Sequence, residues 1–280
     1  MDENKFWDKH PSWQAAEAAW EKNSARSKEN NPLKVLSHLP NMPGITEETA
    51  VNLKWKSLKY LFTHDKTNLF WRYFLKSPFK YPFSLIRSLW KKKSYKRDGD
   101  FFFYGINSME EFKQILTNPK HLLIVGFSYC HKPHECPSQR FTPDCIHDPN
   151  HPVCQQCFIG KAIHALPKDG VVVLIIPTIH DLGEELLKLL NQHPDRELTF
   201  LITACELTLE MFSDWGNMIN LKGVGVRLDG RICNTMRAFE LSEHGVKPGL
   251  TVVLEPAQKQ ILELIHFLRS QRNGTTSEKV

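Results

Sequence analysis

The sequence of 280 residues lacks the short motifs that define several common enzyme mechanisms. It contains no G-x-x-x-x-G-K-[ST] phosphate loop, no H-E-x-x-H helix and no G-x-S-x-G nucleophile elbow. Gly223-Val224-Gly225 lies inside an apolar run rather than after one, so it does not form a dinucleotide-binding fingerprint. The sequence therefore gives no support to the P-loop ATPase, zinc-protease or serine-hydrolase mechanisms.

Long apolar runs are also missing. No segment approaches the roughly 18 to 20 uninterrupted apolar residues that a membrane-spanning helix requires. The polar opening Met1–Lys5 is not followed by an apolar stretch of the signal-peptide type. We therefore expect a cytoplasmic protein that is soluble or lies peripherally on the inner face of the membrane.

Cysteine is absent before Cys130 and after Cys233, and all seven cysteines fall between these two positions. A chain of this length can build a core without disulfides, which small secreted domains need because their cores are small. In a reducing compartment such clustering indicates metal binding or thiol chemistry.

Acidic residues are nearly missing between Lys54 and Arg97, where thirteen Lys or Arg and many aromatic residues accompany one acid, Asp65. This segment carries a net +12 in a chain of formal net charge +5, so the remainder is acidic by about 7. Such a composition suits a helical region on an anionic membrane surface, which is the partner we expect for residues 54–97. Nucleic acid is a less favoured partner. The remaining alternative is helices that pack inward against their own domain while Lys stems cover the rim.

From residue 101 the sequence alternates between apolar runs and amphipathic stretches. The runs predict strands at 101–104, 121–127, 171–176, 198–203, 223–228 and 250–254. The stretches between them predict helices at 158–166, 182–192, 206–212, 235–244 and 257–272. Continuous β-branched runs that alternate with helices indicate a parallel sheet covered on both faces. We therefore predict an α/β protein with a doubly wound, Rossmann-like parallel sheet and a helical, basic and aromatic N-terminal region.

This pattern divides the chain into three regions. Residues 1–50 are predicted to form a polar, loosely ordered leader, although the stretch at 13–20 suits a short helix. Residues 51–100 form the basic, aromatic helical segment. Residues 101–280 form the cysteine-rich α/β domain.

Reactive residues follow the ends of the predicted strands. Cys130 follows the first long run, Thr178 and His180 the second, Cys205 the third and Cys233 the fourth. Because the carboxyl ends of parallel strands meet at one edge of a sheet, these side chains are expected to lie near one another. We expect Thr178, His180, Cys205 and Cys233 to contribute to a cofactor site. In that site the two cysteines would be outer ligands, ligands of a second metal, or a redox-active pair.

Five cysteines lie in the loop from Cys130 to Cys157. The pair Cys154-x-x-Cys157 opens a predicted helix, whose N-terminal N–H groups favour thiolates. The expected metal ligands are Cys130, Cys136, Cys154 and Cys157, whereas Cys145 is interpreted as a free thiol that packs as a small apolar group. Irregular spacing favours an iron–sulfur cluster over zinc, which usually takes two closely spaced pairs.

The predicted function is a redox or electron-transfer role with an unknown redox partner. If the protein is an enzyme, we expect an oxidoreductase. A zinc-stabilised binding module and a metal-free thiol enzyme remain as alternatives.

The cysteine series resembles that of an uncharacterised prokaryotic family, domain of unknown function 116, over roughly residues 120–255. The matching residues are Cys130, Cys136, Cys154-x-x-Cys157, Ala204-Cys205-Glu206-Leu207 and Gly230-Arg231-Ile232-Cys233-Asn234-Thr235. The resemblance implies a metal or iron–sulfur centre held by the cysteines and a membrane-associated N-terminal segment, with no assigned reaction. The chain departs from the family where Gln155 replaces a glycine that is frequent in the close pair and where two residues separate Gly230 from Cys233.

Overall fold

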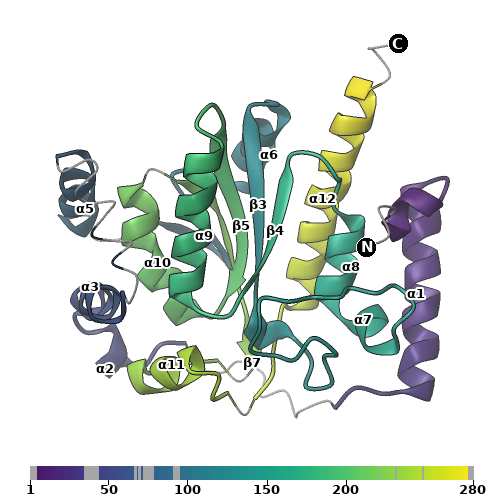
Figure 1. The fold of residues 1–280 in the computed structure, drawn as a ribbon, viewed down its shortest axis with the longest axis horizontal. Helices are drawn as coiled ribbons and strands as arrows, with labels where there is room; N and C mark the ends of the chain where they lie inside the picture. Colours follow the sequence, from purple (N-terminus) through teal and green to yellow (C-terminus); the bar gives the residue numbers. More distant parts are fainter. Residues whose placement is uncertain are drawn as a thin grey trace.

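The computed structural model describes residues 5–34, 44–65, 68, 71, 79–90, 95–219, 221–230, 232–247 and 249–276. Its centre is a six-stranded mixed sheet with the strand order β1-β2-β6-β5-β3-β4 (Figure 1). The strands are β1 (Lys96–Asp98), β2 (Phe101–Tyr104), β3 (His121–Ser128), β4 (Val171–Ile176), β5 (Glu197–Ala204) and β6 (Lys222–Arg227). A second, two-stranded sheet pairs β7 (Asp229–Gly230) with β8 (Thr251–Val252).

Four strands form the parallel part of the main sheet, in the order β4-β3-β5-β6. The chain thus builds outward from β3 to β4 on one side and from β5 to β6 on the other, so its direction of growth changes between β3 and β5. Beyond β6, the sheet is extended by β2, which pairs antiparallel with β6, and by β1, which pairs antiparallel with β2. A tight turn joins β1 to β2, and in it Gly99 adopts a φ of 55°. The α/β fold predicted from the sequence is confirmed. The prediction for 250–254 is wrong in one respect, because only Thr251–Val252 is a strand and it belongs to the second sheet.

Helices surround the sheet on both faces. They are α1 (Trp13–Asn30), α2 (Glu47–Ala50), α3 (Leu53–His64), α5 (Lys80–Trp90), α6 (Met109–Thr117), α7 (Pro152–Gln156), α8 (Phe158–Ala165), α9 (Ile179–Gln192), α10 (Glu206–Met218), α11 (Met236–Glu243) and α12 (Glu255–Thr276), with short 3-10 turns at Phe6–Lys9 and Tyr129–His131. Several begin at a side chain that accepts a backbone N–H, as the sequence signals for helix starts require. These N-caps are Ser12 for α1, Ser108 for α6, Thr178 for α9 and Thr235 for α11.

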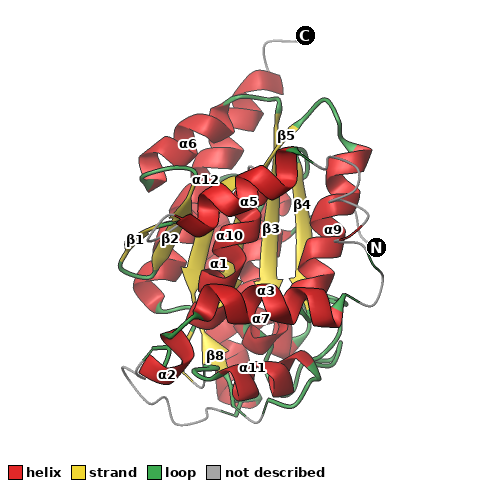
Figure 2. Ribbon diagram, turned by 90° about the vertical axis from the view of Figure 1, so that its left-hand side faces the viewer, coloured by secondary structure: helices red, strands yellow, loops and turns green. Residues whose placement is uncertain are grey.

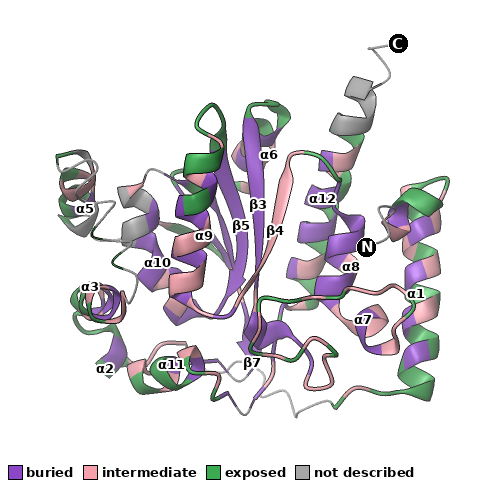
Figure 3. Ribbon diagram, viewed as in Figure 1, coloured by how far each residue is buried: buried purple, intermediate pink, exposed green. Residues whose placement is uncertain are grey.

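Alternation along the strands divides the core into two layers. In β3, Leu123, Val125 and Phe127 pack with α6, α8 and α12, whereas Leu122 and Ile124 face α9 and α10. Figure 3 shows β3 and β5 buried along their length, while the edge strand β4 is only half-buried. Helices α3 and α5 contact α10 and lie outside it, farther from the sheet (Figures 1 and 2). None of the helices in the described part of the chain is long and apolar enough to cross a membrane.

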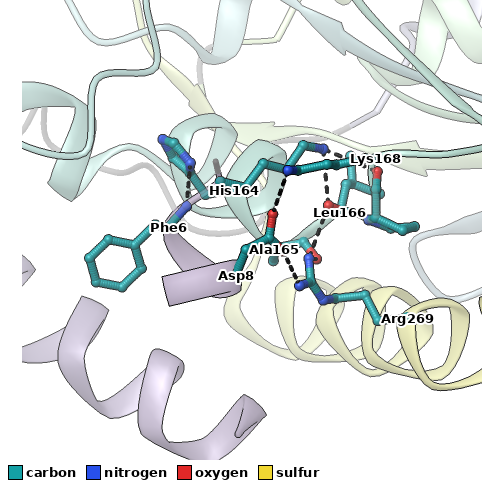
Figure 4. Close-up of polar contacts among 9 residues, drawn as sticks. Phe6, Asp8, His164, Ala165, Leu166, Lys168 and Arg269 are labelled. Carbon is teal, nitrogen blue, oxygen red and sulfur yellow. Dashed lines mark hydrogen bonds and ion pairs between the residues drawn. The ribbon is translucent and has the colours of Figure 1, made fainter. Parts of the chain in front are cut away.

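Residues 5–30, part of the predicted leader 1–50, are held against the body, and residues 1–4 and 35–43 of that leader lie outside the described residues. Lys5 Nζ donates to the carbonyls that follow α8, at 2.9 and 3.1 Å, and Phe6 N donates to His164 Nδ1 at 3.1 Å. Asp8 forms an ion pair with Arg269 of α12 at 2.5 Å (Figure 4). Buried tryptophans add apolar area to these polar contacts, so the polar composition of α1 hides a packed face.

Candidate metal centre and thiol cluster

The structure separates the seven cysteines, all of them free, into two groups. The first group, the four-thiol cavity, contains Cys136, Cys145, Cys154 and Cys157. The second group, the three-thiol cluster, contains Cys130, Cys205 and Cys233 together with Lys247.

The loop between β3 and α8 builds the four-thiol cavity, which has a volume of about 20 Å³. Cys136 and Cys145 come from the irregular part of this loop, and Cys154 lies in the short helix α7. Cys157 ends α7 and begins α8, so the close pair spans the junction of two helices. Gly160 also lines the cavity, and it packs closely against α7. A Cβ at this position would lie 2.5 Å from the carbonyl oxygen of Cys154, so a larger residue would not fit without a shift of α7.

Burial and mutual repulsion oppose ionisation of Cys145, Cys154 and Cys157. Burial, together with the neighbouring sulfurs, raises the pKa of Cys154 and of Cys157 to about 12. Backbone N–H groups act in the opposite direction: those of Gly160 and Ile159 lower the pKa of Cys157, and that of Asp148 lowers the pKa of Cys154. A bound cation would reverse this balance, because metal coordination deprotonates thiols.

Lys132 supplies a buried positive charge beside the cavity. Its side chain is among the least exposed in the protein, at 1%. Its Nζ donates to Thr142 Oγ1 at 3.1 Å and to the carbonyl oxygens of Thr142 and Asp144 at 3.2 and 2.8 Å. Three of the four thiols lie close enough to act electrostatically on this ammonium group. Lys132 thus braces the loop and offsets negative charge in the four-thiol cavity.

The four cysteines line one cavity, but their sulfurs are not at positions from which they could coordinate one metal ion. Across the described residues, no three or more His, Cys, Asp or Glu side chains are arranged to hold a metal ion. Coordination would therefore require the thiols to turn inward from their present positions. The donor set itself fits soft metals, since four thiolates suit zinc and iron.

The three-thiol cluster lies where the sheet changes its direction of growth. Cys130 follows β3, Cys205 follows β5, and Cys233 arrives from the segment after β7. Lys247 Nζ donates to Cys233 Sγ at 3.3 Å, and Cys205 and Cys233 pack in the same buried cluster. The Cys205 thiol, followed by the ammonium group, lowers the pKa of Cys233, while the same pairing raises that of Cys205.

The structure brings three of the four cysteines expected as ligands into one cavity. Cys136, Cys154 and Cys157 share the cavity, but Cys130 lies in the three-thiol cluster and Cys145 takes its place. Cys130 directly follows β3, and the 3-10 turn at Tyr129–His131 holds it under the sheet edge. The sequence feature that could have placed Cys145 in the cavity is its equal spacing from two of the other cysteines. Eight residues separate it from Cys136 and eight from Cys154.

Thr178 and His180, expected in a cofactor site, line a hollow that no cysteine lines. Thr178 is the N-cap of α9, where its Oγ1 accepts from Asp181 N at 3.1 Å. The hollow has a volume of about 870 Å³ and lies between α3, α9 and α11. Glu243 also lines it, and burial raises the pKa of this carboxyl to about 8.

Comparison with known proteins identifies no relative: no protein-family model, no curated protein and no solved structure matches the chain. The function is therefore argued from the residues of the two thiol groups.

Proposed function

We propose that the protein is a metal-binding redox protein whose centre is one iron ion held by Cys136, Cys145, Cys154 and Cys157. The observation that carries the proposal is the convergence of these four cysteines on one cavity beside the buried Lys132. A cavity of about 20 Å³ is close to the volume of one water-sized probe, so it favours a single ion over a multi-iron cluster. When bound, iron supplies one-electron transfer.

The residues of the chain provide what such a centre needs. Four thiolates would neutralise the cation and leave excess negative charge. The backbone N–H groups near the sulfurs of Cys154 and Cys157, together with the Lys132 ammonium group, limit that excess. Cys157 also lines a hollow of about 590 Å³ between α1, α7 and β8, which gives the centre one side near the surface. A redox partner would exchange electrons from this side.

Two further expectations belong to this proposal. The strand order β4-β3-β5-β6 supports a doubly wound sheet of the flavodoxin-like type, related to the Rossmann-like sheet expected from the sequence, in which ligands bind where the growth direction reverses. Seven free cysteines fit a reducing compartment, so we assign the protein to the cytoplasm.

Metal and sulfide analysis of protein purified without oxygen tests the proposal. We expect one iron per chain without acid-labile sulfide, and a coloured protein. The matched variants are Cys145→Ser and Cys130→Ser, which separate the four-thiol cavity from the ligand set expected from the sequence. Apparent metal-binding energies of roughly 10–16 kcal/mol for four ligands give about 3 kcal/mol per ligand, or about 100-fold weaker binding.

We expect this loss for Cys145→Ser and unchanged iron for Cys130→Ser. Iron retained by Cys145→Ser would contradict the four-thiol centre. Zinc alone in the wild-type protein would replace the redox role by that of a zinc-stabilised binding module.

A second proposal concerns α5, which presents a stripe of exposed apolar side chains at helical spacing. The stripe consists of Phe79, Phe83, Ile86 and Trp90, which are 87%, 68%, 46% and 86% exposed. It lies in the basic region 54–97, part of which is outside the described residues. Apolar side chains next to many cations fit the headgroup layer of an anionic bilayer. We propose that this stripe docks the protein peripherally on the inner face of the membrane.

Vesicle flotation tests this docking. The wild-type protein is expected to float with vesicles that contain phosphatidylserine at low salt, and the double variant Phe83→Ser/Trp90→Ser is expected to stay in the dense fraction. Leu241→Ser, which removes an exposed apolar side chain from α11, is the matched control. Equal flotation of all three proteins would refute a role for the stripe.

A further inference from the structure

The three-thiol cluster combines a buried cation with thiols and remains unexplained by the four-thiol centre. Lys247 is only 8% exposed, and its Nζ donates to Cys233 Sγ. A buried ammonium group is costly unless an anion pairs with it. The ammonium group lies 3.3 Å from Cys233 Sγ and lowers the pKa of that thiol, so the anion that pairs with Lys247 is the Cys233 thiolate.

Cys205 is placed to react with Cys233. The two side chains pack in the same buried cluster and each shifts the pKa of the other, and Thr208 Oγ1 contacts Cys205 Sγ at 3.1 Å. Cys205 begins the connection from β5 to α10, whereas Cys233 arrives from beyond β7, so neighbouring sulfurs come from separate elements. One sulfur is paired with a cation and the other is a neutral thiol in contact with it, which is the arrangement of a nucleophile and a resolving thiol.

Access limits what can react at this site. Cys205 is 6% and Cys233 4% exposed, and neither lines any of the hollows described above. A bulky disulfide cannot reach a sulfur buried in this way, whereas hydrogen peroxide is little larger than water. We propose that Cys205 and Cys233 form a redox-active dithiol in which Cys233 attacks a small hydroperoxide and Cys205 resolves the product as a disulfide.

The chemistry balances within the cluster. The Cys233 thiolate attacks one peroxide oxygen, so an S–O bond forms, the O–O bond breaks, and the departing oxygen takes a proton from Lys247. The product is a sulfenic acid at Cys233. Cys205 Sγ then attacks this sulfur, the S–S bond forms and water leaves with the Cys205 proton. Two electrons pass from two sulfurs to the peroxide, and a small dithiol, which is not subject to the size limit set by burial, restores both thiols.

Oxidation also explains the choice of a lysine. A disulfide carries no charge, so the ammonium group loses its counter-ion when the pair is oxidised. Because Lys247 gives its proton to the leaving oxygen, the buried site is neutral before and after the reaction. An arginine, which does not lose its proton in proteins, would keep an unpaired buried charge in the oxidised state.

Peptide mass spectrometry after treatment with hydrogen peroxide tests the proposal on the full-length, metal-loaded protein. We expect a cross-linked peptide that joins Cys205 to Cys233 with the loss of two hydrogen atoms. Cys205→Ser should stop at a sulfenic acid on Cys233, which dimedone traps, and Cys233→Ser should give neither product. Cys130→Ser is the matched control and should form the same cross-link. A cross-link through Cys130, or dimedone labelling of Cys205 in place of Cys233, would overturn the assignment.

Lys247→Met tests the role of the cation. A thiol without a cationic partner is a few per cent ionised at pH 7, so we expect oxidation of Cys233 to slow by about 30-fold. The difference should shrink toward pH 9, where an ordinary thiol ionises. The charged and titratable groups around Cys233 are Cys130, Cys205, Lys247 and Glu243, with Tyr129 and Arg140 beside Cys130. Equal rates for variant and wild type at pH 7, with equal circular dichroism, would refute activation by Lys247.

The test is independent of the proposed iron centre. In Cys145→Ser protein, which is expected to lack iron, the cross-link between Cys205 and Cys233 should still form. Its absence there, with a native circular dichroism spectrum, would overturn a separate dithiol site whatever the iron content of the wild type.

Discussion

Replacing Glu243 with glutamine should make the protein more stable, and more so as the pH rises. Glu243 ends α11, and its Oε2 accepts a hydrogen bond from Ile179 N at 2.9 Å. Burial, followed by the negative groups of Asp181 and Cys233, raises the pKa of this carboxyl from 4.5 to about 8. The side chain of Tyr60 and the Ile179 N–H only partly offset that burial.

The sign and size follow from the linkage between proton binding and folding. In the unfolded chain Glu243 ionises near pH 4.5, whereas in the folded protein it keeps its proton until about pH 8. Between these values the folded state binds more protons, so the free energy of unfolding falls as the pH rises. The loss is about 1 kcal/mol at pH 5, about 3 kcal/mol at pH 7 and about 4 to 5 kcal/mol at pH 8 to 9. Glutamine stays neutral, so it avoids this loss and still accepts from Ile179 N.

Urea unfolding of wild type and Glu243→Gln from pH 5 to 9 measures the difference. The gap between the two free energies of unfolding should widen by about 3 to 4 kcal/mol over this range. Glu240→Gln, on the exposed face of the same helix, is the matched control and should follow the wild type at every pH. A gap that is constant with pH would show that Glu243 is ionised in the folded protein and would refute the reasoning.

Two further substitutions test the packing of α1 and the wall of the four-thiol cavity. Trp20→Ala should lower the free energy of unfolding by roughly 3 to 5 kcal/mol, because the side chain is buried between α1 and the body, whereas Trp55→Ala, 66% exposed, should change it by less than about 0.5 kcal/mol. Similar urea midpoints for both variants would show that α1 is not docked. Gly160→Ala should lower the metal content, because the new Cβ would lie 2.5 Å from the Cys154 carbonyl oxygen and displace α7. Undiminished metal binding in this variant would place the centre elsewhere.

The strands of the parallel core were predictable because their sequences satisfy one physical requirement along their whole length. Runs such as His121–Ser128 are apolar on both faces, since helices cover the sheet on both sides. Lys96–Asp98 gives no such signal, because this edge strand is exposed and charged. The docking of α1 was hidden for a related reason, since a few large tryptophans supply the burial and the rest of the helix is polar.

The site was predictable only as far as strand ends determine position. That rule brings Cys130, Cys205 and Cys233 to one edge of the sheet, where the structure has them. It does not give the path of the loop that follows Cys130, and this path decides which thiols share a cavity. Lys132 holds the loop from inside, and a lysine gives no sign in the sequence that it will be buried.

The ion pair between Asp8 and Arg269 joins residues 261 positions apart and has a consequence for the order of folding. On the ribosome, residues 5–30 emerge long before α8 and α12, the surfaces on which they pack. The tryptophans of this segment therefore stay in water while most of the chain is made, and domains generally form from the N-terminus onward during synthesis. Here α1 leaves the ribosome before α8 and α12 and packs only after them, so the nascent chain presents an aromatic segment suited to chaperone binding until α12 is complete.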